Sequence, residues 1–419
     1  MRRSTRVVLA LLAALALVAG ACAQDTDDVA LGEFTGVSIT FSTSLAEEER
    51  DAVNELVGRF ETQTGAAVNI AAVTSADLPE KLKVEVAAGE ATIHLFAQDN
   101  LALRVLVDEQ LVQEVDDVEI PDAVIDAMIP DTFDGKSFFL PYRPNVRVAY
   151  VNTERFNAAD VAPPQTHTEF RAVAEQLKAE AGTPKVTLSL AEGDPAAVTI
   201  SEWIVSFGGD PLILNDEGSV EAFEFLQALW QDELLAKETL QAKFDTEVDN
   251  LRGEVAWLAQ NWPFTSGVFA DEGLIDRFNV YAGWSGPERA AHVIGGEVLG
   301  IPTGVSDEQR EAAVALATFL MSREAQEVLA EQNAWPSIRD DAYATVPEDQ
   351  QGTFEAITAA FTDGWFRPNV PYWSDVSDAM NEGVRRIMVG GEDTQTVLDA
   401  LHDDIAEAAE QKDADYPPA

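Results

Sequence analysis

The sequence of 419 residues contains very little cysteine and very little positive charge. Cys22 is the only cysteine, which excludes a disulfide within the chain and a metal site built from several thiolates. The 27 lysines and arginines face 74 acids, so the formal net charge is −47. Nucleic acids and anionic bilayers are bound through clustered basic residues, so we expect neither as a partner.

Motifs of catalysis and of metal binding are missing as well. The four histidines lack the paired spacing of a zinc site, and the sequence has no Gly-x-Ser-x-Gly elbow and no Walker loop. We therefore expect no metal, no cofactor and no enzymatic activity. Acids are so abundant, however, that counting them leaves open a secreted carbohydrate-active enzyme, either a lyase or a glycosidase with two carboxylates.

The one long hydrophobic run lies at the N-terminus. Three arginines precede an uncharged stretch over residues 7–21, as in a secretory signal peptide. The stretch has about 15 residues, whereas a membrane-spanning helix needs roughly 20. Small residues lead directly to Cys22, and this junction resembles a bacterial lipobox, whose cysteine carries lipid after cleavage. We predict a signal peptide over residues 1–21, a lipid-anchored tether over 22–34, and an extracytoplasmic location at the outer face of the cell membrane or in the periplasm.

Along the rest of the chain, apolar residues recur alternately at strand spacing and at helix spacing. Strands are expected over residues 37–42, 66–73, 92–97, 146–151 and 254–259. Helices are expected over residues 47–64, 78–88, 101–111, 169–181, 222–235, 308–320, 324–331, 376–389 and 394–409. This alternation predicts an α/β fold whose strands pair largely in parallel.

Several of the eight tryptophans lie in polar loops rather than on periodic apolar faces. Trp262, Trp335 and Trp373 are each followed by proline or serine. A flat indole ring covers the apolar C–H face of a pyranose, while acidic, amide and guanidinium side chains bond to its hydroxyls. These loops therefore favour carbohydrate binding. Trp203 and Trp230 lie on helical stretches, and we assign them to the core.

Six segments occur in a fixed order over nearly the whole chain after Cys22, at residues 93–101, 141–152, 253–262, 295–301, 312–329 and 367–374. The first carries Gln98-Asp99 at the end of a predicted strand, and the fourth opens with the pair Gly295-Gly296. Together the segments resemble bacterial extracellular solute-binding proteins of family 1, the maltose/trehalose-type sugar-binding lipoproteins of ABC importers.

This resemblance implies a two-lobe periplasmic-binding-protein fold of type II, hinged around a ligand cleft. Each lobe would contain a mostly parallel sheet flanked by helices. The first lobe would comprise residues 35–144 and 298–335, and the second lobe residues 145–297 and 336–419.

The resemblance also implies a set of ligand-binding residues. Asp99, together with Gln98, would accept hydrogen bonds from ligand hydroxyls, and Arg367 would donate a forked pair. Trp262 and Trp373 would stack on sugar faces. The other residues assigned to the site are Ser42, Ser44, Asn145, Asn261, Gly295, Gly296, Glu297 and Trp335.

Three of these assignments concern the hinge. Asn145 would bind the sugar from the hinge side, and Gly295 and Gly296 would let backbone N–H groups approach the ligand. Glu297 departs from the family pattern, because trehalose-type members often carry an aromatic residue after the glycine pair. The acid removes a stacking surface and adds a charge, which argues against trehalose itself as the ligand.

These observations predict a monomeric binding protein that captures a small-molecule carbohydrate, such as a disaccharide or short oligosaccharide of the maltose or trehalose type. Hinge closure would present the loaded form to the permease of an ABC transporter, with lipid on Cys22 anchoring the protein to the membrane. One alternative is the carbohydrate-active enzyme, and another keeps the fold but binds a polyol, a glycerophosphodiester or a cationic solute. A phosphorylated ligand would need several bases in the cleft, for which Arg143, Arg147 and Arg367 are the candidates.

Overall fold

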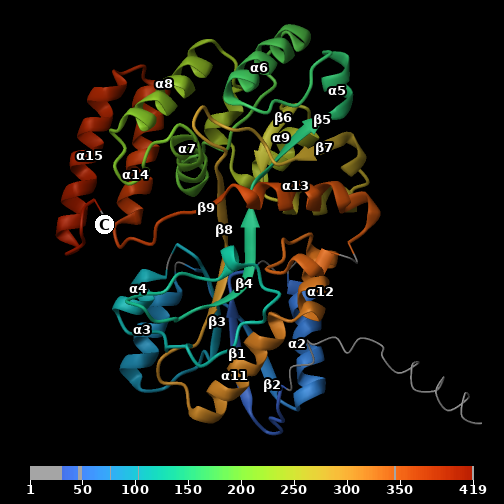
Figure 1. Cartoon of the computed structure of the whole chain (residues 1–419), viewed down its shortest axis with the longest axis vertical. Coiled ribbons are helices and arrows are strands. Elements are labelled where there is room, and N and C mark those ends of the chain that lie inside the picture. The colour runs from blue at the N-terminus through green and yellow to red at the C-terminus, as the bar shows by residue number, and fades with distance from the viewer. Residues whose placement is uncertain (1–30, 46–49, 76, 102, 344–345, 418–419) are drawn as a thin grey trace, which may run out of the picture.

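The computed structural model describes residues 31–45, 50–75, 77–101, 103–343 and 346–417. These residues form two lobes, one above the other in Figure 1, each with its own sheet and hydrophobic core. The predicted signal peptide, Cys22 and most of the predicted tether lie outside the described residues. Within the described part, no helix combines the length and the apolar character needed to cross a membrane.

The first lobe, in the lower half of Figure 1, is built on a six-stranded sheet with the order β2-β1-β3-β8-β4, and β9 pairs with β8. Its strands are β1 (Ser38–Thr43), β2 (Ala67–Ala72), β3 (Leu95–Asp99), β4 (Leu140–Val146), β8 (His292–Gly300) and β9 (Gly364–Phe366). Its helices are α2 (Arg50–Thr64), α3 (Leu78–Ala88), α4 (Arg104–Asp108), α11 (Asp307–Leu320) and α12 (Arg323–Asn333).

The second lobe, in the upper half of Figure 1, contains a three-stranded sheet with the order β6-β5-β7. Its strands are β5 (Val148–Asn152), β6 (Leu258–Asn261) and β7 (Phe278–Tyr281). Its α-helices are α5 (Thr153–Ala158), α6 (His167–Ala181), α7 (Asp194–Ser206), α8 (Glu217–Gln231), α9 (Phe244–Arg252), α10 (Phe264–Asp271), α13 (Gln351–Thr362), α14 (Trp373–Gly383) and α15 (Thr394–Gln411). Short 3₁₀ turns occur at Asp126–Met128, Lys237–Gln241, Ile275–Arg277, Asp340–Tyr343 and Glu348–Gln350.

Local sequence explains why these helices form where they do. Leu56, Val57 and Phe60 of α2 are buried at spacings of one to four residues, so one face of the helix packs into the first lobe. At the start of α6, the Thr166 side chain accepts a hydrogen bond from the backbone N–H of Glu169. This bond satisfies one of the amide donors that the first helical turn leaves unpaired.

The chain passes between the lobes along two adjacent strands. β4 leads into β5 with Arg147 as the one residue between them, and β8 returns in the opposite direction. The segment after α12 leads back to α13. A hydrophobic cluster joins these connections, because it contains Val146 and Val148 together with Ala330 of α12 and Ile357 of α13.

The two-lobe α/β fold predicted from the sequence is confirmed, but the expected predominance of parallel pairing is wrong. β5 is antiparallel to both β6 and β7, and β8 is antiparallel to both β3 and β4. Parallel pairing is found for β1 with β2 and β3, and for β8 with β9. The reason is topological: β4 leaves the first lobe where β8 enters it, so these neighbours must run in opposite directions.

Several boundaries also differ from the predictions. The helix expected over residues 101–111 shrinks to α4, and the strand expected over 254–259 starts only at Leu258. The helix expected over residues 376–389 is divided, because α14 ends at Gly383 and the chain continues as a π-helix over Val384–Val389.

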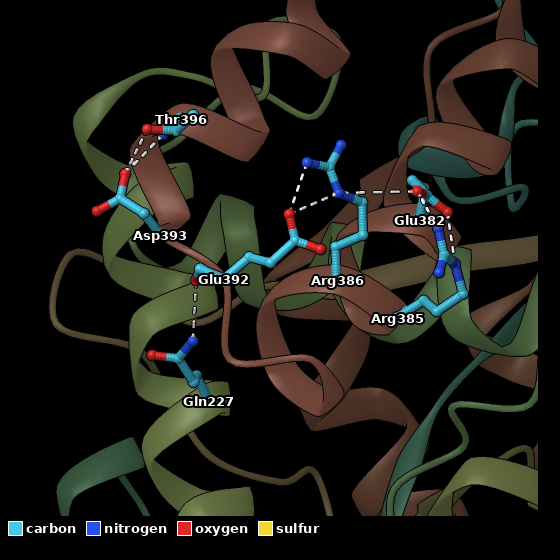
Figure 2. A network of polar contacts seen from close by, with 7 residues as sticks. All are labelled: Gln227, Glu382, Arg385, Arg386, Glu392, Asp393 and Thr396. Atoms are coloured by element: carbon cyan, nitrogen blue, oxygen red, sulfur yellow. Dashed lines mark hydrogen bonds and ion pairs between the residues drawn. The ribbon is translucent and has the colours of Figure 1, made fainter.

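Polar contacts hold this π-helix against α8 in the second lobe, as Figure 2 shows. The side-chain amide of Gln227 donates to the carbonyl oxygens of Ile387 (2.9 Å) and Glu392 (3.3 Å). Arg386 pairs with the carboxylates of Glu392 (2.7 Å) and Glu382 (3.8 Å). The π-helix is therefore stabilised by side chains from α8, from α14 and from the segment that follows the π-helix itself.

Candidate ligand-binding cleft between the lobes

Polar side chains from neighbouring strands meet at the end of the first-lobe sheet that leads to the second lobe. Asp99 ends β3 and pairs in register with Glu297 of β8. Arg143 of β4 lies opposite Glu297 on the other side, and Ser44 directly follows β1. Register partners on adjacent strands lie about 5 Å apart, so these side chains form one cluster.

Glu297 lies at the centre of this cluster and is almost fully buried. Its Oε2 lies 3.1 Å from Nη2 of Arg143, and its Oε1 accepts a 2.6 Å hydrogen bond from Ser44 Oγ. The guanidinium carbon of Arg143 lies 4.2 Å from the centroid of the Trp335 ring, which is a cation–π geometry. Trp335, predicted to contact the ligand, is therefore covered by this arginine and is 3% exposed.

Asp99 is half-buried, and its Oδ1 accepts a 2.9 Å hydrogen bond from the backbone N–H of Leu101. Burial raises the pKa of Asp99, while the Arg367 guanidinium opposes this rise. The carboxylates of Asp194 and Glu297 raise the pKa further. The pKa of Asp99 therefore depends on charged groups of the second lobe as well as on those of its own sheet.

Arg367 follows β9 and links the cleft to helix α7. Its Nη1 donates a 2.8 Å hydrogen bond to Oδ1 of Asp194, the first residue of α7. The Trp373 ring centroid lies 5.8 Å from the guanidinium carbon of Arg367. The Nε of Arg367 is buried and has no hydrogen-bond partner among the described protein groups, so it is a donor that a bound molecule could use.

Asp194 was not predicted as a site residue. Its signal in the sequence is the triplet Gly193-Asp194-Pro195, which is typical of a helix start. That pattern places a carboxylate at the N-terminus of α7, but it does not indicate which arginine the carboxylate meets.

The glycine pair of β8 allows close packing of strands. Gly296 has a φ angle of 107°, and an added Cβ would overlap the carbonyl oxygen of Arg143. At Gly295, an added Cβ would lie 3.0 Å from Cη2 of Trp262. Gly295 is the register partner of Asn145, whose side-chain oxygen accepts the next backbone N–H at 3.1 Å. The structure thus gives both glycines a packing role beside the crossing strands.

Asn261 ends β6 and Trp262 directly follows it, and both make internal contacts. Trp262 packs edge-on against Phe244, with 5.5 Å between ring centroids, and is 8% exposed. The side-chain amide of Asn261 donates to the Phe244 carbonyl (2.7 Å) and to Thr265 Oγ1 (2.9 Å). These contacts fix the loop that carries the tryptophan.

Three further predicted site residues are buried within their lobes. Gln98 donates its side-chain amide to the carbonyl of Ser75 at 3.0 Å, and Ser42 lies inside the sheet. Trp373 is the first residue of α14 and belongs to the core of the second lobe. The structure thus brings together Ser44, Asp99, Glu297, Trp335 and Arg367, and it packs the other aromatic and amide candidates against the protein itself.

A cavity of about 780 Å³ lies between the second lobe and the end of α12. Its lining includes Asn333 and Trp335 on one side and Asp194, Phe244 and Phe264 on the other. This volume suits a small-molecule ligand. Two cavities of about 740 and 910 Å³ lie within the second lobe, so size does not single this cavity out. It is the candidate site because two of its lining residues, Asp194 and Trp335, contact Arg367 and Arg143 of the polar cluster.

The groups that converge in this region are suited to binding a polar molecule. In the part of the chain that the structure describes, no cluster of His, Cys, Asp and Glu could hold a metal ion. The groups that meet in the cleft are carboxylates, guanidinium groups, a hydroxyl and indole rings. They can hold a polar molecule through planar hydrogen bonds and apolar contact.

A buried ion pair connects the two crossing strands to α7. Arg147, between β4 and β5, donates from Nη1 to Glu202 (2.9 Å) and to Thr199 (2.9 Å). The other oxygen of Glu202 accepts the backbone N–H of Val293 in β8 at 2.9 Å. Burial raises the pKa of Glu202, and Arg147 opposes the rise. One carboxylate therefore holds both strands where they pass between the lobes.

Two α/β lobes joined by crossing strands, with polar groups converging between them, define a hinged binding protein. Over residues 55–356, well over half of the chain, the sequence matches the family model of bacterial extracellular solute-binding proteins. The chain therefore belongs to that family, and the resemblance seen in its sequence is confirmed.

Known proteins share this fold at low sequence identity. A binding protein of Brucella abortus (strain 2308) is 23% identical over 279 residues, which cover 64% of this chain and 67% of that protein. The maltose-bound structure of T. maritima MalE3 has a TM-score of 0.75 at 19% identity and covers 88% of this chain and 99% of that chain. UgpB from Mycobacterium tuberculosis, in complex with glycerophosphocholine, has a TM-score of 0.74 at 16% identity and covers 90% and 99% of the two chains.

Proposed function

We propose that this protein captures a sugar, either a disaccharide or a short oligosaccharide, and delivers it to the permease of an ABC transporter. The observation that carries the proposal is the meeting of groups from both lobes beside the crossing strands. Asp99 and Glu297 come from the first-lobe sheet, and Asp194 belongs to the second lobe. A ligand held by both sets of groups would favour the closed arrangement of the lobes.

Polar groups in the cleft support binding of a polyhydroxy compound. The Asp99 carboxylate can accept from ligand hydroxyls, and the buried Nε of Arg367 can donate to a hydroxyl oxygen. Trp335 and Trp373 are buried beside Arg143 and Arg367, so the two indole rings hold these guanidinium groups in place. Family membership adds to this support, because solute-binding proteins hold and release a molecule and carry no reaction of their own. We therefore infer that the chain is not an enzyme.

The anchoring and the domain limits belong to the same proposal. Lipid on Cys22 would keep a monomeric protein at the membrane face, with residues 22–34 as its tether. Residues 35–144 and 298–335 would move as one lobe, and residues 145–297 and 336–419 as the other. Strands β8 and β9, which pair within the first-lobe sheet, would lie at the boundary between the two moving parts. Energy for import would come from the ATPase of the transporter, since the described fold needs only to open and close.

Isothermal titration calorimetry tests the proposal on the purified chain without its signal peptide. The panel consists of maltose, maltotriose, trehalose, ribitol and glycerophosphocholine. We expect at least one sugar to bind, and we expect small-angle scattering to show a more compact particle in its presence. Binding of ribitol or glycerophosphocholine alone would overturn the choice of a sugar, and an absence of binding across the panel would count against the proposed function.

A further inference from the structure

The three arginines that the sequence offers to a phosphorylated ligand are all paired with acids in the structure. Arg367 pairs with Asp194 at 2.8 Å, and Arg143 pairs with Glu297 at 3.1 Å. The third, Arg147, lies fully buried against its own glutamate at 2.9 Å. Each positive charge near the crossing strands is thus balanced before any ligand arrives.

Acids outnumber bases in the rest of the cleft. Among the described residues Asp99 makes no ion pair, and its carboxylate accepts a hydrogen bond from the backbone N–H of Leu101. The cavity beside Trp335 is lined by one base, Lys243, and by four acids, namely Asp194, Asp245, Asp271 and Glu331. The electrostatic potential around these described residues is therefore negative, and each of the three arginines already faces an acid.

We propose that the cleft admits neutral or amine-bearing polyhydroxy compounds and rejects their phosphorylated counterparts. The inference rests on the proposed function and specifies its ligand class. A phosphate group would have to displace Asp194 or Glu297 from its arginine, which would leave a buried carboxylate without its partner. Alternatively it would lie beside Asp99 without compensation, where two like charges repel each other in a partly buried site.

The same geometry suits a hydroxyl. A hydroxyl oxygen can accept from Arg367 Nε while the ion pair with Asp194 stays intact, and a hydroxyl hydrogen can donate to Asp99. An ammonium group would reduce the negative charge at Asp99. The paired arginines therefore act as oriented donors whose net charge is already cancelled.

Matched pairs of compounds test this selectivity by calorimetry. The probes are trehalose with trehalose 6-phosphate, maltose with maltose 1-phosphate, and ribitol with ribitol 5-phosphate. In each pair that binds, we expect the neutral member to bind at least tenfold more tightly. Equal or tighter binding of the phosphorylated member would overturn the inference while solute binding itself stands, whereas a failure of both members in every pair would overturn the proposed function and this inference with it.

Charge-releasing variants provide a second measurement. Asp194→Asn removes the acid that pairs with Arg367, and Glu297→Gln removes one negative charge beside Arg143, so either variant should narrow the neutral-to-phosphorylated affinity ratio by at least threefold. Asp232→Asn is the matched control, because it removes an acid from Arg171 on the surface of the second lobe, where Arg171 keeps its pair with Glu175, and it should leave the ratio unchanged. Circular dichroism checks folding, and the two cleft variants are independent, so one misfolded variant leaves the other to decide. An unchanged ratio in a folded cleft variant would overturn the inference.

Discussion

At the scale of single residues, His167 illustrates what burial does to one titratable group. It opens α6, and its ring centroid lies 4.6 Å from that of Trp203, 5.0 Å from Phe207 and 5.6 Å from Phe225. Burial among these rings lowers the pKa of His167 to about 3. The histidine is therefore neutral in the folded protein at all mild pH values and functions as an aromatic core residue.

We predict that His167 makes the protein sensitive to acid. The ordinary pKa of about 6.5 applies in the unfolded chain, so the unfolded chain takes up the proton first as the pH falls. The stability of the folded protein with a neutral His167 is fully present above pH 6.5. Between pH 6.5 and 5, the unfolding free energy should fall by about 2 kcal/mol. Urea unfolding of wild type and His167→Phe at pH 8, 6.5 and 5 measures this. As the pH falls, the unfolding free energy of the wild type should decrease more than that of the variant. A difference in unfolding free energy that stays constant with pH would contradict the prediction.

Trp262 is a second residue at which packing and ligand contact must be separated. We expect Trp262→Ala to lower the unfolding free energy by about 3–5 kcal/mol, because the indole fills space against Phe244 and Gly295. If the ring also stacks on the sugar, ligand affinity should fall at least tenfold. Urea unfolding and calorimetry on the same variant report the two effects, with Trp262→Phe as the conservative comparison. Lower stability with unchanged affinity would make Trp262 a packing residue only.

At the scale of elements, β4 and β8 carry most of what defines the site. They pair along Arg143, Asn145 and their partners in β8, and they supply the acid and the base at the centre of the cleft. Helix α7 holds the same strands through Glu202 and begins with Asp194, which pairs with Arg367. A shift of α7 relative to β8 would therefore alter the hinge contact and the cleft contact together.

The register of β4 and β8 depends on Gly296, so we expect Gly296→Ala to be strongly destabilising. The positive φ angle and the overlap with the Arg143 carbonyl should together cost about 3 kcal/mol or more. Gly352→Ala is the matched control, since Gly352 lies in the first turn of α13 with open space around it. That change should stabilise by up to about 1 kcal/mol. Thermal unfolding measures the change in Tm for each variant. Changes of equal sign and size in Gly296→Ala and Gly352→Ala would contradict the packing role of Gly296.

At the scale of the whole molecule, the net charge of −47 is the dominant physical property. Twenty-seven bases cannot pair with 74 acids, so most acids face solvent and repel one another. The ion pairs at the cleft and the hinge are local exceptions to this excess. In these ion pairs a buried or partly buried arginine neutralises a neighbouring acid, whereas the acids on the surface remain in excess over the bases.

Because the surface charges repel one another, we predict that salt stabilises this protein. Raising NaCl from 0.05 to 1 M shortens the screening length from well above 10 Å to about 3 Å. The Tm at pH 7.5 should rise by roughly several degrees as the repulsion is screened. The control is the same experiment near pH 4.5, close to the sequence pI of about 4.1, where little net charge is left. An equal rise at both pH values would show that the effect does not come from charge repulsion.

The fold was more predictable from the sequence than the candidate site was. The limits of α3 agree with the predicted helix over residues 78–88, because its apolar spacing and the glycine that ends it are local signals. Asp99 and Glu297 were predicted as site residues from their motifs, and the structure places them side by side. Trp262 and Asn261 were predicted in the same way, but their loop folds back onto Phe244, which no local pattern indicates.

The sequence by itself determined many of the helices and strands, the α/β class and the acidic surface, because periodicity, capping and composition act over short distances, and the resemblance of its motifs to a known family implied the two lobes. Only the tertiary structure decided which charges meet. Asp194 and Arg367 are 173 positions apart, and Arg143 and Glu297 are 154 apart. Their pairing, and the antiparallel course of the crossing strands, depend on how the chain returns through the hinge, since contact between distant residues is fixed by the path of the backbone.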